Sequence, residues 1–405
     1  MGQEESLEGA LGRLRVVDLT DERGIYGAKL LADLGADVIR PEPPGGDPLR
    51  ARGPHVQTDQ QGADVPADGC TSLYYAYFAS GRRSLLVDPG DATSRAQFSR
   101  LLARADVILF CDRHWSSELV DIEQLSAEGT EQILINVSSF GTDGPWADYL
   151  APDIVAGALG GAMATTGDAS TPPLKAFGEL NFMVSGAYAA IAALAAVHAR
   201  DTQNVAQRVD VSVHECIASC LEQVFMFYWY ADGALERPGQ QVLPRQGPTH
   251  WSNAFTVMNG QNGSIMITPT PDFDRQLAWL IEEEAYGDLL EPQYSDPANL
   301  KLLIGRTMQL LAEWVATKDV EALFYEAQAR HIPYGWVQPL ARVGDNPQLL
   351  GRDWFQNQRI AGRDIRAPGA PYHLSRTPWQ LKAAPDSGQH TAQILADIGW
   401  QNDHE

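Results

Sequence analysis

The chain has little positive charge. Lysine and arginine together number 30, against 52 aspartates and glutamates, which gives a formal net charge of −22 at pH 7. A protein that binds nucleic acid needs a basic stripe to neutralise phosphates, and the sequence has none. Nucleic acid is therefore excluded as a partner, and any anionic ligand must be bound by a few local arginines.

Cysteine is also scarce, with 4 in 405 residues. That number is too small for a disulfide scaffold in a chain of this length. Cys216 and Cys220 are one helical turn apart, but no second pair of ligands follows them. We therefore expect reduced core thiols and no metal site.

Long hydrophobic runs are missing. The longest, at residues 183–197, has about 15 residues, whereas a helix needs about 20 apolar residues to cross a bilayer. The N-terminus is acidic and polar, unlike a signal peptide. We therefore expect a cytoplasmic protein with no membrane partner.

Two common signatures of catalysis are absent as well. No G-x-G-x-x-G follows a predicted strand, and the scattered serines and histidines lack a nucleophile elbow. The sequence instead alternates short apolar segments with segments of helical periodicity. The predicted strands are 15–19, 37–41, 84–87, 106–110 and 133–137, and predicted helices are 26–34 and 92–105. This alternation is typical of an α/β fold with a doubly wound parallel sheet, which binds ligands at the carboxyl ends of its strands.

The composition changes near residue 231. Residues 231–250 are rich in glycine and proline and are predicted to form a linker. Strand-like segments at 255–258 and 264–268 then flank Asn-Gly-Gln-Asn-Gly, which indicates a hairpin. Helical segments at 274–285 and 302–317 complete a smaller α+β domain.

Many short motifs occur in the order found in one protein family. The matching segments are 14–20, 30–39, 43–50, 80–85, 137–146, 153–154, 209–212, 331–335, 345–348 and 374–378. They include V-D-V-S at 209–212 and L-S-R-T-P at 374–378. Over almost its whole length the chain resembles the family III CoA-transferases, which include formyl-CoA and carnitine CoA-transferases and the methylacyl-CoA racemases.

The resemblance implies an architecture and a substrate. Both ends of the chain, residues 1–230 and 331–405, are expected to form a large Rossmann-like domain. The small domain is expected at 251–330, after the linker. Two chains of the family thread through one another as interlocked rings, so we expect an interlocked dimer. A CoA thioester is the expected substrate, with no tightly bound cofactor.

The residue that the family uses as nucleophile is missing. The family carries an aspartate four residues before the glycine of a G-[LMA]-[YH] helix start, and this carboxylate becomes acylated. Gly186 begins the matching Gly-Ala-Tyr, which places Phe182 at the position of the aspartate. A phenyl ring cannot be acylated. Glu179 is the outside candidate, because an insertion of three residues in the match would place it there; otherwise it is a carboxylate at a helix start or an interface.

The resemblance assigns CoA binding to arginines. Arg82 and Arg83 match the family's basic pair at the adenosine phosphates, and Arg113 matches the arginine of its E-N-F-R-P-G motif. Arg23 lies in the altered loop after the first strand, and Asp112 replaces an aromatic residue beside the nucleotide. Drift of a surface loop is one explanation of these changes. Their clustering at one predicted site favours lost or reassigned function.

Two functional hypotheses follow. In the first, the chain is the non-catalytic subunit of a heteromeric CoA-transferase, resembling the E-type subunit of benzylsuccinate CoA-transferases, and its partner is a homologous subunit that bears the aspartate. Such an enzyme moves CoA from an acyl-CoA such as succinyl-CoA to a carboxylic acid, with an aryl-substituted succinate as the candidate acceptor. In the second, the chain is a self-sufficient homodimeric acyl-CoA transferase or racemase that uses Glu179.

Overall fold

The computed structural model describes residues 9–57, 70–112, 114–121, 125, 131–221, 224–226, 245, 247, 255–268 and 272–400. These residues form two compact units. The first contains the described parts of 1–162, 176–222 and 347–405, and the second contains those of 163–175 and 223–346. Both ends of the described chain therefore belong to the first unit.

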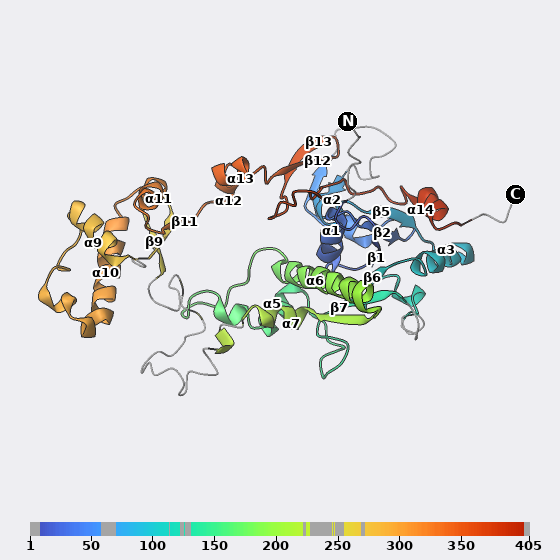
Figure 1. Cartoon of the computed structure of the whole chain (residues 1–405), viewed down its shortest axis with the longest axis horizontal. Coiled ribbons are helices and arrows are strands. Elements are labelled where there is room, and N and C mark those ends of the chain that lie inside the picture. The colour runs from blue at the N-terminus through green and yellow to red at the C-terminus, as the bar shows by residue number, and fades with distance from the viewer. Residues whose placement is uncertain are drawn as a thin grey trace. The chain divides into compact units, whose positions relative to one another are not determined.

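A six-stranded parallel sheet forms the centre of the first unit, in the order β5-β2-β1-β6-β7-β8 (Figure 1). The strands are β1 (Arg15–Leu19), β2 (Asp37–Glu42), β5 (Arg83–Leu86), β6 (Val107–Phe110), β7 (Ile133–Ser138) and β8 (Arg208–Ser212). The chain runs outward from β1 to β2 and β5 and then returns to β6, so the strand order reverses between β1 and β6. The predicted α/β fold with a doubly wound parallel sheet is confirmed. Sheets of this kind bind ligands beside the strand ends at the reversal.

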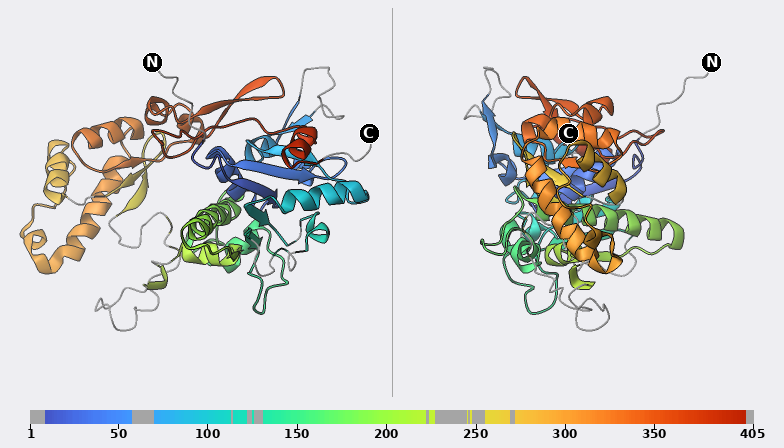
Figure 2. Two further views of the ribbon diagram at one scale, coloured as in Figure 1. Left: turned by 45° about the vertical axis from the view of Figure 1, so that its right-hand side comes forward. Right: turned by 90° about the vertical axis from the view of Figure 1, so that its left-hand side faces the viewer.

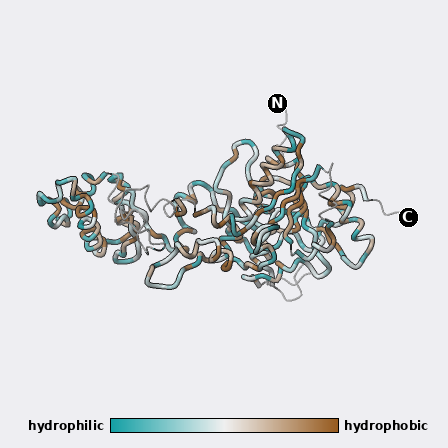
Figure 3. The backbone as a smooth tube through the Cα atoms, turned by 90° about the horizontal axis from the view of Figure 1, so that it is seen from below, coloured by the Kyte–Doolittle hydropathy of each residue, from teal (hydrophilic) through white to brown (hydrophobic). Residues whose placement is uncertain are grey.

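The strands are apolar because helices cover both faces of the sheet. Every residue of β6 and β7 is buried. Figure 3 colours the backbone by hydropathy, with hydrophobic stretches in brown. One face packs against α1 (Ile25–Asp33), α5 (Asp153–Leu159), α6 (Leu180–Gln203) and α7 (Val213–Ser219). The other packs against α3 (Ala92–Leu102) and α14 (Thr391–Asp397). Parallel strands buried on both sides explain the nearly continuous apolar segments of the sequence.

Helix α6 has 24 residues and extends well beyond the apolar run seen in the sequence. By length and composition it could cross a membrane, but Ala189 and Ala193 on one side of it are completely buried in the core. Helix α1 lies alongside it (Figures 1 and 2). The two helices approach so closely that a Cβ atom on Gly27 would lie 2.6 Å from the carbonyl oxygen of Gly186. Helix α6 is therefore a packed element of the α/β unit.

The second unit is a small α+β structure. Its antiparallel sheet has the order β11-β10-β9, and the hairpin of β9 (Thr256–Asn259) and β10 (Ser264–Ile267) lies where the sequence predicted one. Its helices are α9 (Phe273–Glu282), α10 (Leu300–Val315), α11 (Val320–Ala329) and α12 (Leu340–Val343). The core contains Trp279 and Tyr334, and the Tyr334 hydroxyl donates to Gln276 Oε1 at 2.6 Å.

The boundaries of the units differ from the predicted ones. The sequence places the return to the large domain at residue 331, whereas the units divide before Pro347, because β11 (Gly335–Trp336) pairs with β10. Residues 163–175 belong to the second unit, although the sequence places them in the large domain. Apart from positions 245 and 247, the predicted linker at 231–250 lies outside the described residues.

The remaining elements are short. They are α2 (Leu73–Phe78), α13 (Pro347–Gly351), the hairpins β3 (His55–Gln57) with β4 (Cys70–Ser72) and β12 (Gln356–Ile360) with β13 (Arg363–Ala367), and single 3-10 turns at Pro48–Ala51, Ser117–Leu119, Met163–Thr165, Pro292–Ser295 and Pro297–Asn299. The last segment is fastened to β5, because the backbone N–H of Ser84 donates to His390 Nδ1 at 3.3 Å and the N–H of His390 donates to Ser84 O at 3.1 Å.

Candidate active site

The loops that follow β1 and β6 meet at the reversal of the strand order. The first loop carries Asp21 and Arg23, and the second carries Asp112. Arg23 is only 6% exposed. Its Nη2 lies 2.5 Å from Asp21 Oδ2, and its Nη1 lies 2.7 Å from Asp112 Oδ1. One guanidinium is thus shared by two carboxylates.

The ionisation of the cluster keeps Arg23 in place. Burial acts to raise the pKa of Asp21, but the hydrogen bonds and the charge of Arg23 lower it below its usual value. Burial raises the pKa of the neighbouring Cys111 thiol, which stays neutral. Arg23 was predicted to be a CoA-binding residue. The two carboxylates engage three of its five N–H donors, and only 6% of the residue is exposed.

The loop after β1 is attached to α6, which carries Phe182. Ser185 Oγ donates to the backbone oxygen of Arg23 at 2.9 Å. Phe182, one turn before Ser185, is only 4% exposed and belongs to the apolar cluster that contains Val137 and Ala156. The position that the sequence match assigns to the family's aspartate therefore holds a phenyl ring packed in the core.

Asp153 accepts hydrogen bonds at the first turn of α6. Its Oδ1 accepts the backbone N–H of Phe182 at 3.1 Å, and its Oδ2 accepts Asn181 Nδ2 at 2.9 Å. The first N–H groups of a helix have no partner within the helix, and a negative charge beside them is favourable. Asp153 is 8% exposed and fully engaged in this way. Its carboxylate therefore orients the helix.

Glu179 immediately precedes α6 and is held by two side chains. It forms an ion pair with Arg52 and accepts a hydrogen bond from Tyr74. The Arg52 guanidinium lies 4.4 Å from the centroid of the Tyr74 ring. Burial, followed by the charge of Glu179, raises the pKa of Tyr74, so the phenol stays protonated and keeps donating. A nucleophilic Glu179 would first have to be released from both partners.

Arg82 lies in a buried network beneath the start of α1. Its side chain has no exposed surface; Nε donates to Asp18 Oδ2 at 2.7 Å and Nη2 donates to Ile25 O at 2.7 Å. Arg40 pairs with the same Asp18 oxygen at 2.9 Å and donates to Thr20 O at 2.9 Å. The guanidinium of Arg82 does not reach the surface of this structure, and its assignment to phosphate binding stays a prediction. The network instead supports the loop after β1 from below.

Arg83 points to the other edge of the sheet. Its Nη2 lies 2.7 Å from Asp37, the first residue of β2, and its Nη1 lies 2.6 Å from Asp397 of α14. Arg113 lies outside the described residues. The structure thus does not bring together Arg23, Arg82 and Arg83, the described members of the predicted CoA-binding set.

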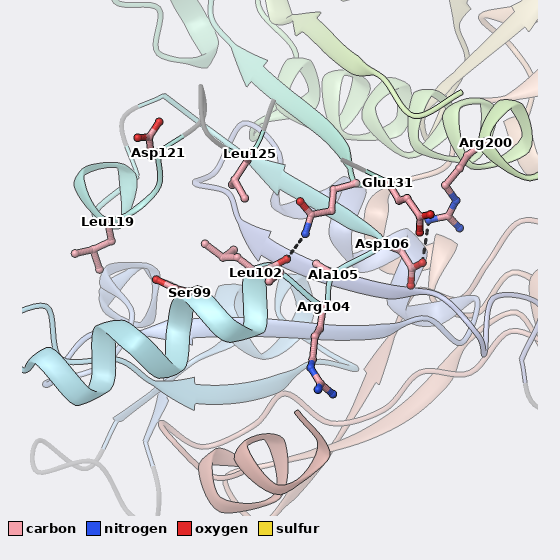
Figure 4. A pocket seen from close by; sticks show the side chains of 12 residues that line it. Ser99, Leu102, Arg104, Ala105, Asp106, Leu119, Asp121, Leu125, Glu131 and Arg200 are labelled. Atoms are coloured by element: carbon pink, nitrogen blue, oxygen red, sulfur yellow. Dashed lines mark hydrogen bonds and ion pairs between the residues drawn. The ribbon is translucent and has the colours of Figure 1, made fainter. Parts of the chain in front are cut away.

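A pocket of about 900 Å³ lies at the amino ends of β6 and β7 (Figure 4). Beside it Arg200 Nη1 lies 2.9 Å from Asp106 Oδ1, and Gln132 Nε2 donates to Leu102 O at 2.7 Å. This edge is opposite to the loops at the strand reversal. The pocket is therefore separate from the candidate active site. Over the described ranges, no group of three or more His, Cys, Asp or Glu side chains could hold a metal ion.

Comparison with known proteins decides the family. The profile of CoA-transferase family III matches residues 11–391. The chain belongs to CoA-transferase family III. It is 30% identical over 407 residues to succinyl-CoA:(R)-benzylsuccinate CoA-transferase subunit BbsE of Thauera aromatica, covering 99% of this chain and 95% of that protein. It is 30% identical to succinyl-CoA:mesaconate CoA-transferase of Haloarcula hispanica, covering 96% and 97%.

Solved structures support the same assignment of fold. A CAIB/BAIF family protein from Brucella suis superposes with a TM-score of 0.79 at 24% identity, covering 97% of this chain and 100% of that one. As a family III CoA-transferase, the chain belongs to an enzyme class whose substrates are CoA thioesters, and its relatives include proteins named for their use of succinyl-CoA.

Some residues of this candidate site could not be found from the sequence. Arg52 and Glu179 are 127 positions apart, and no periodicity connects them. Tyr74 likewise reaches Glu179 only through the fold. The sequence does mark Asp153, because this residue matches the aspartate of the family's Y-D-[LI] motif. The motif does not show that its carboxylate accepts a hydrogen bond from the first turn of α6.

Proposed function

We propose that this chain is a subunit, without the catalytic aspartate, of a heteromeric family III CoA-transferase. The enzyme moves CoA from an acyl-CoA such as succinyl-CoA to a carboxylic acid. A homologous subunit supplies the aspartate, and this chain shapes the shared assembly. We expect the complex in the cytoplasm.

The burial of Phe182 carries the proposal. Family chemistry needs a carboxylate that attacks a thioester, with donors that stabilise the oxyanion. The phenyl ring has no group to acylate and is packed in the apolar cluster on α6. The relative in Thauera aromatica, named as a subunit of its enzyme, supports the role. Its name also supports an aryl-substituted succinate as acceptor.

An exposed apolar stripe on α6 supports a protein partner. Leu180, Tyr188 and Ile191 repeat at helical spacing and are 48%, 40% and 61% exposed. Apolar surface of this kind, gathered on one element, is typical of an interaction face. We expect the partner to cover it within an interlocked dimer. Because threaded chains must close together, co-expression should then be needed for a soluble product.

The second candidate function is a homodimeric transferase or racemase that uses Glu179. Its position directly before α6, with 26% of the side chain exposed, favours this candidate. The ion pair with Arg52 and the hydrogen bond from Tyr74 oppose it, because both hold the carboxylate in place.

Activity measurements separate the two candidates. The purified chain alone should transfer no CoA from succinyl-CoA to benzylsuccinate or mesaconate. Co-expression with a homologue that has aspartate at the position matching Phe182 should give activity, and replacing that aspartate with alanine should abolish it. Glu179→Gln in this chain should leave the activity of the complex unchanged. Turnover by this chain alone would contradict the proposal.

Covalent trapping gives an independent readout. Hydroxylamine converts an acylated carboxylate to a hydroxamate, which mass spectrometry detects on a peptide. With succinyl-CoA we expect labelling of the partner's aspartate and none of Glu179. A hydroxamate on Glu179 would establish the second candidate.

A further inference from the structure

The segment at residues 380–391, here called the C-terminal segment, lies along the free edge of the central sheet. Strand β5 is at one end of the strand order, so one of its edges faces away from the sheet. Two N–H groups on this edge donate to side chains of the C-terminal segment. The N–H of Ser84 donates to His390 Nδ1 at 3.3 Å, and the N–H of Leu86 donates to Thr391 Oγ1 at 2.9 Å. Unpaired N–H groups on an edge strand promote association with other chains, so these two side chains protect β5.

Ser84 is the residue at which the C-terminal segment is fastened most closely. Besides its bond to the imidazole, its carbonyl oxygen accepts the backbone N–H of His390 at 3.1 Å. Its hydroxyl accepts the N–H of Gly388 at 2.8 Å and donates to Glu42 Oε1 at 2.6 Å. Among the acceptors of these bonds, only His390 Nδ1 belongs to a group that titrates near neutral pH.

Other contacts hold the same segment independently of His390. The N–H of Gly81 donates to Ala383 O at 3.1 Å, and Arg50 Nη2 donates to Pro385 O at 2.8 Å. Beyond the segment, Arg83 Nη1 lies 2.6 Å from Asp397 Oδ2. Loss of the bond to His390 therefore loosens the edge of β5 locally and leaves the segment attached.

Protonation of His390 removes the acceptor that Ser84 uses. A neutral imidazole has one N–H donor and one acceptor nitrogen, so the bond to Nδ1 requires the proton on Nε2. The imidazolium ion has two N–H donors and no acceptor. In acid the N–H of Ser84 would therefore face another N–H across the same contact.

The imidazole lies beside a pocket of about 440 Å³ at the amino edge of β2 and β5, through which water can reach it. His390 is half-buried. Burial, followed by the charge of Arg83, lowers its pKa below the usual 6.5. The charged groups on the elements around the ring are Asp37, Glu42, Arg82, Arg83, Lys382 and Asp397.

We propose that His390 is a pH-sensitive clasp, which fastens the C-terminal segment to the edge of β5 at neutral pH and releases Ser84 in mild acid. The folded state favours the neutral ring, so the pKa of His390 is lower in the folded chain than in the unfolded one. The contribution of the clasp to stability is therefore complete above pH 6.5 and is lost as the pH falls below that value. The proposal does not rest on the transferase role, because it involves only β5 and the C-terminal segment.

Hydrogen exchange of the β5 amides, followed by mass spectrometry at about pH 7.5 and about pH 5, tests the clasp on either side of the histidine titration. The full chain is used, purified alone or with a co-expressed partner. After correction for the intrinsic pH dependence of exchange, the protection of β5 should fall about three- to tenfold in acid, the effect of losing one hydrogen bond. Strand β7, inside the sheet, should keep its protection and serves as the internal reference. Equal protection of β5 at the two pH values would overturn the proposal.

Three variants assign the effect to His390. His390→Gln has a side chain that does not titrate, so its β5 protection should be the same at both pH values. The matched control His373→Gln, at an exposed position before the C-terminal segment, should show the fall seen in the wild type. Thr391→Val removes the other side-chain acceptor and should lower the protection equally at both pH values. A fall in His390→Gln as large as that in the wild type would place the pH sensitivity elsewhere and reject the clasp.

Titration of the His390 ring by NMR gives a readout that needs no variant of the clasp. The midpoint should lie below 6.5, because the bond from Ser84 requires the neutral ring. A midpoint above 6.5 would show that the folded chain favours the imidazolium ion, which contradicts the proposal.

Discussion

Two clusters in the first unit contain the same two residue types, arginine and aspartate, but differ in how far they are buried. Beneath the start of α1, the side chains of Arg40, Arg82 and Asp18 are completely buried. At the amino edge of the sheet, Arg83 pairs with Asp37, whose side chain is 27% exposed. Buried charges depend on one another, because removing one leaves its partner desolvated and unpaired, whereas exposed pairs are largely screened by water. Arg82 and Arg83 are adjacent in the sequence, yet one is an internal support and the other a surface contact.

The largest expected effect is at Arg82. Arg82→Met should lower the free energy of unfolding by about 3–5 kcal/mol, because Asp18 keeps only one of its two buried partners. Arg83→Met should lower it by less than about 1 kcal/mol. Urea denaturation followed by circular dichroism measures both. Similar losses in the two variants would remove the distinction between the clusters.

Phe182 provides an apolar reference in the same unit. Phe182→Ala should cost about 3–5 kcal/mol of unfolding free energy, because it leaves a cavity among packed side chains. Phe182→Leu keeps most of the volume and should cost less than about 1.5 kcal/mol. The same denaturation experiment applies. A mild effect of the alanine variant would mean that the phenyl ring is not part of the core.

The pH dependence of stability tests the buried cluster at Asp18. Burial opposes its ionisation, but the charges of Arg40 and Arg82 prevail and hold its pKa at about 2, below the usual 3.8. Its contribution to stability is therefore complete above pH 3.8 and is lost as the pH falls towards 2, a loss of roughly 2 kcal/mol. The titration of the Asp18 carboxyl carbon by NMR reports this pKa directly. A midpoint near 4 would show that the arginines only offset the cost of burial.

The smallest expected effect is at Glu179. Its pair with Arg52 is about one-third exposed, so Glu179→Gln should lower the free energy of unfolding by less than about 1 kcal/mol. A double-mutant cycle with Arg52→Met isolates the pair from other contacts of either residue. A coupling of several kcal/mol would show that this pair behaves like the buried cluster.

Local patterns predicted the framework of the molecule, and long-range contacts decided the site. The apolar segments at 15–19 and 133–137 became parallel strands, because strand periodicity is a local property. Sequence adjacency could not show that Arg82 turns inward and Arg83 outward. The pairing of Gly335–Trp336 with β10, which delays the return to the first unit, also depends on residues far apart in the chain.

The contact between Gly27 and Gly186 limits how this protein can be redesigned. A Cβ atom on Gly186 would lie 2.8 Å from the backbone nitrogen of Gly27, so a side chain at either glycine would force the two helices apart. This close packing holds the loop after β1 and the first turns of α6 in a fixed relative position. The distance between that loop and any carboxylate introduced on the first turns of α6 is therefore set by this packing.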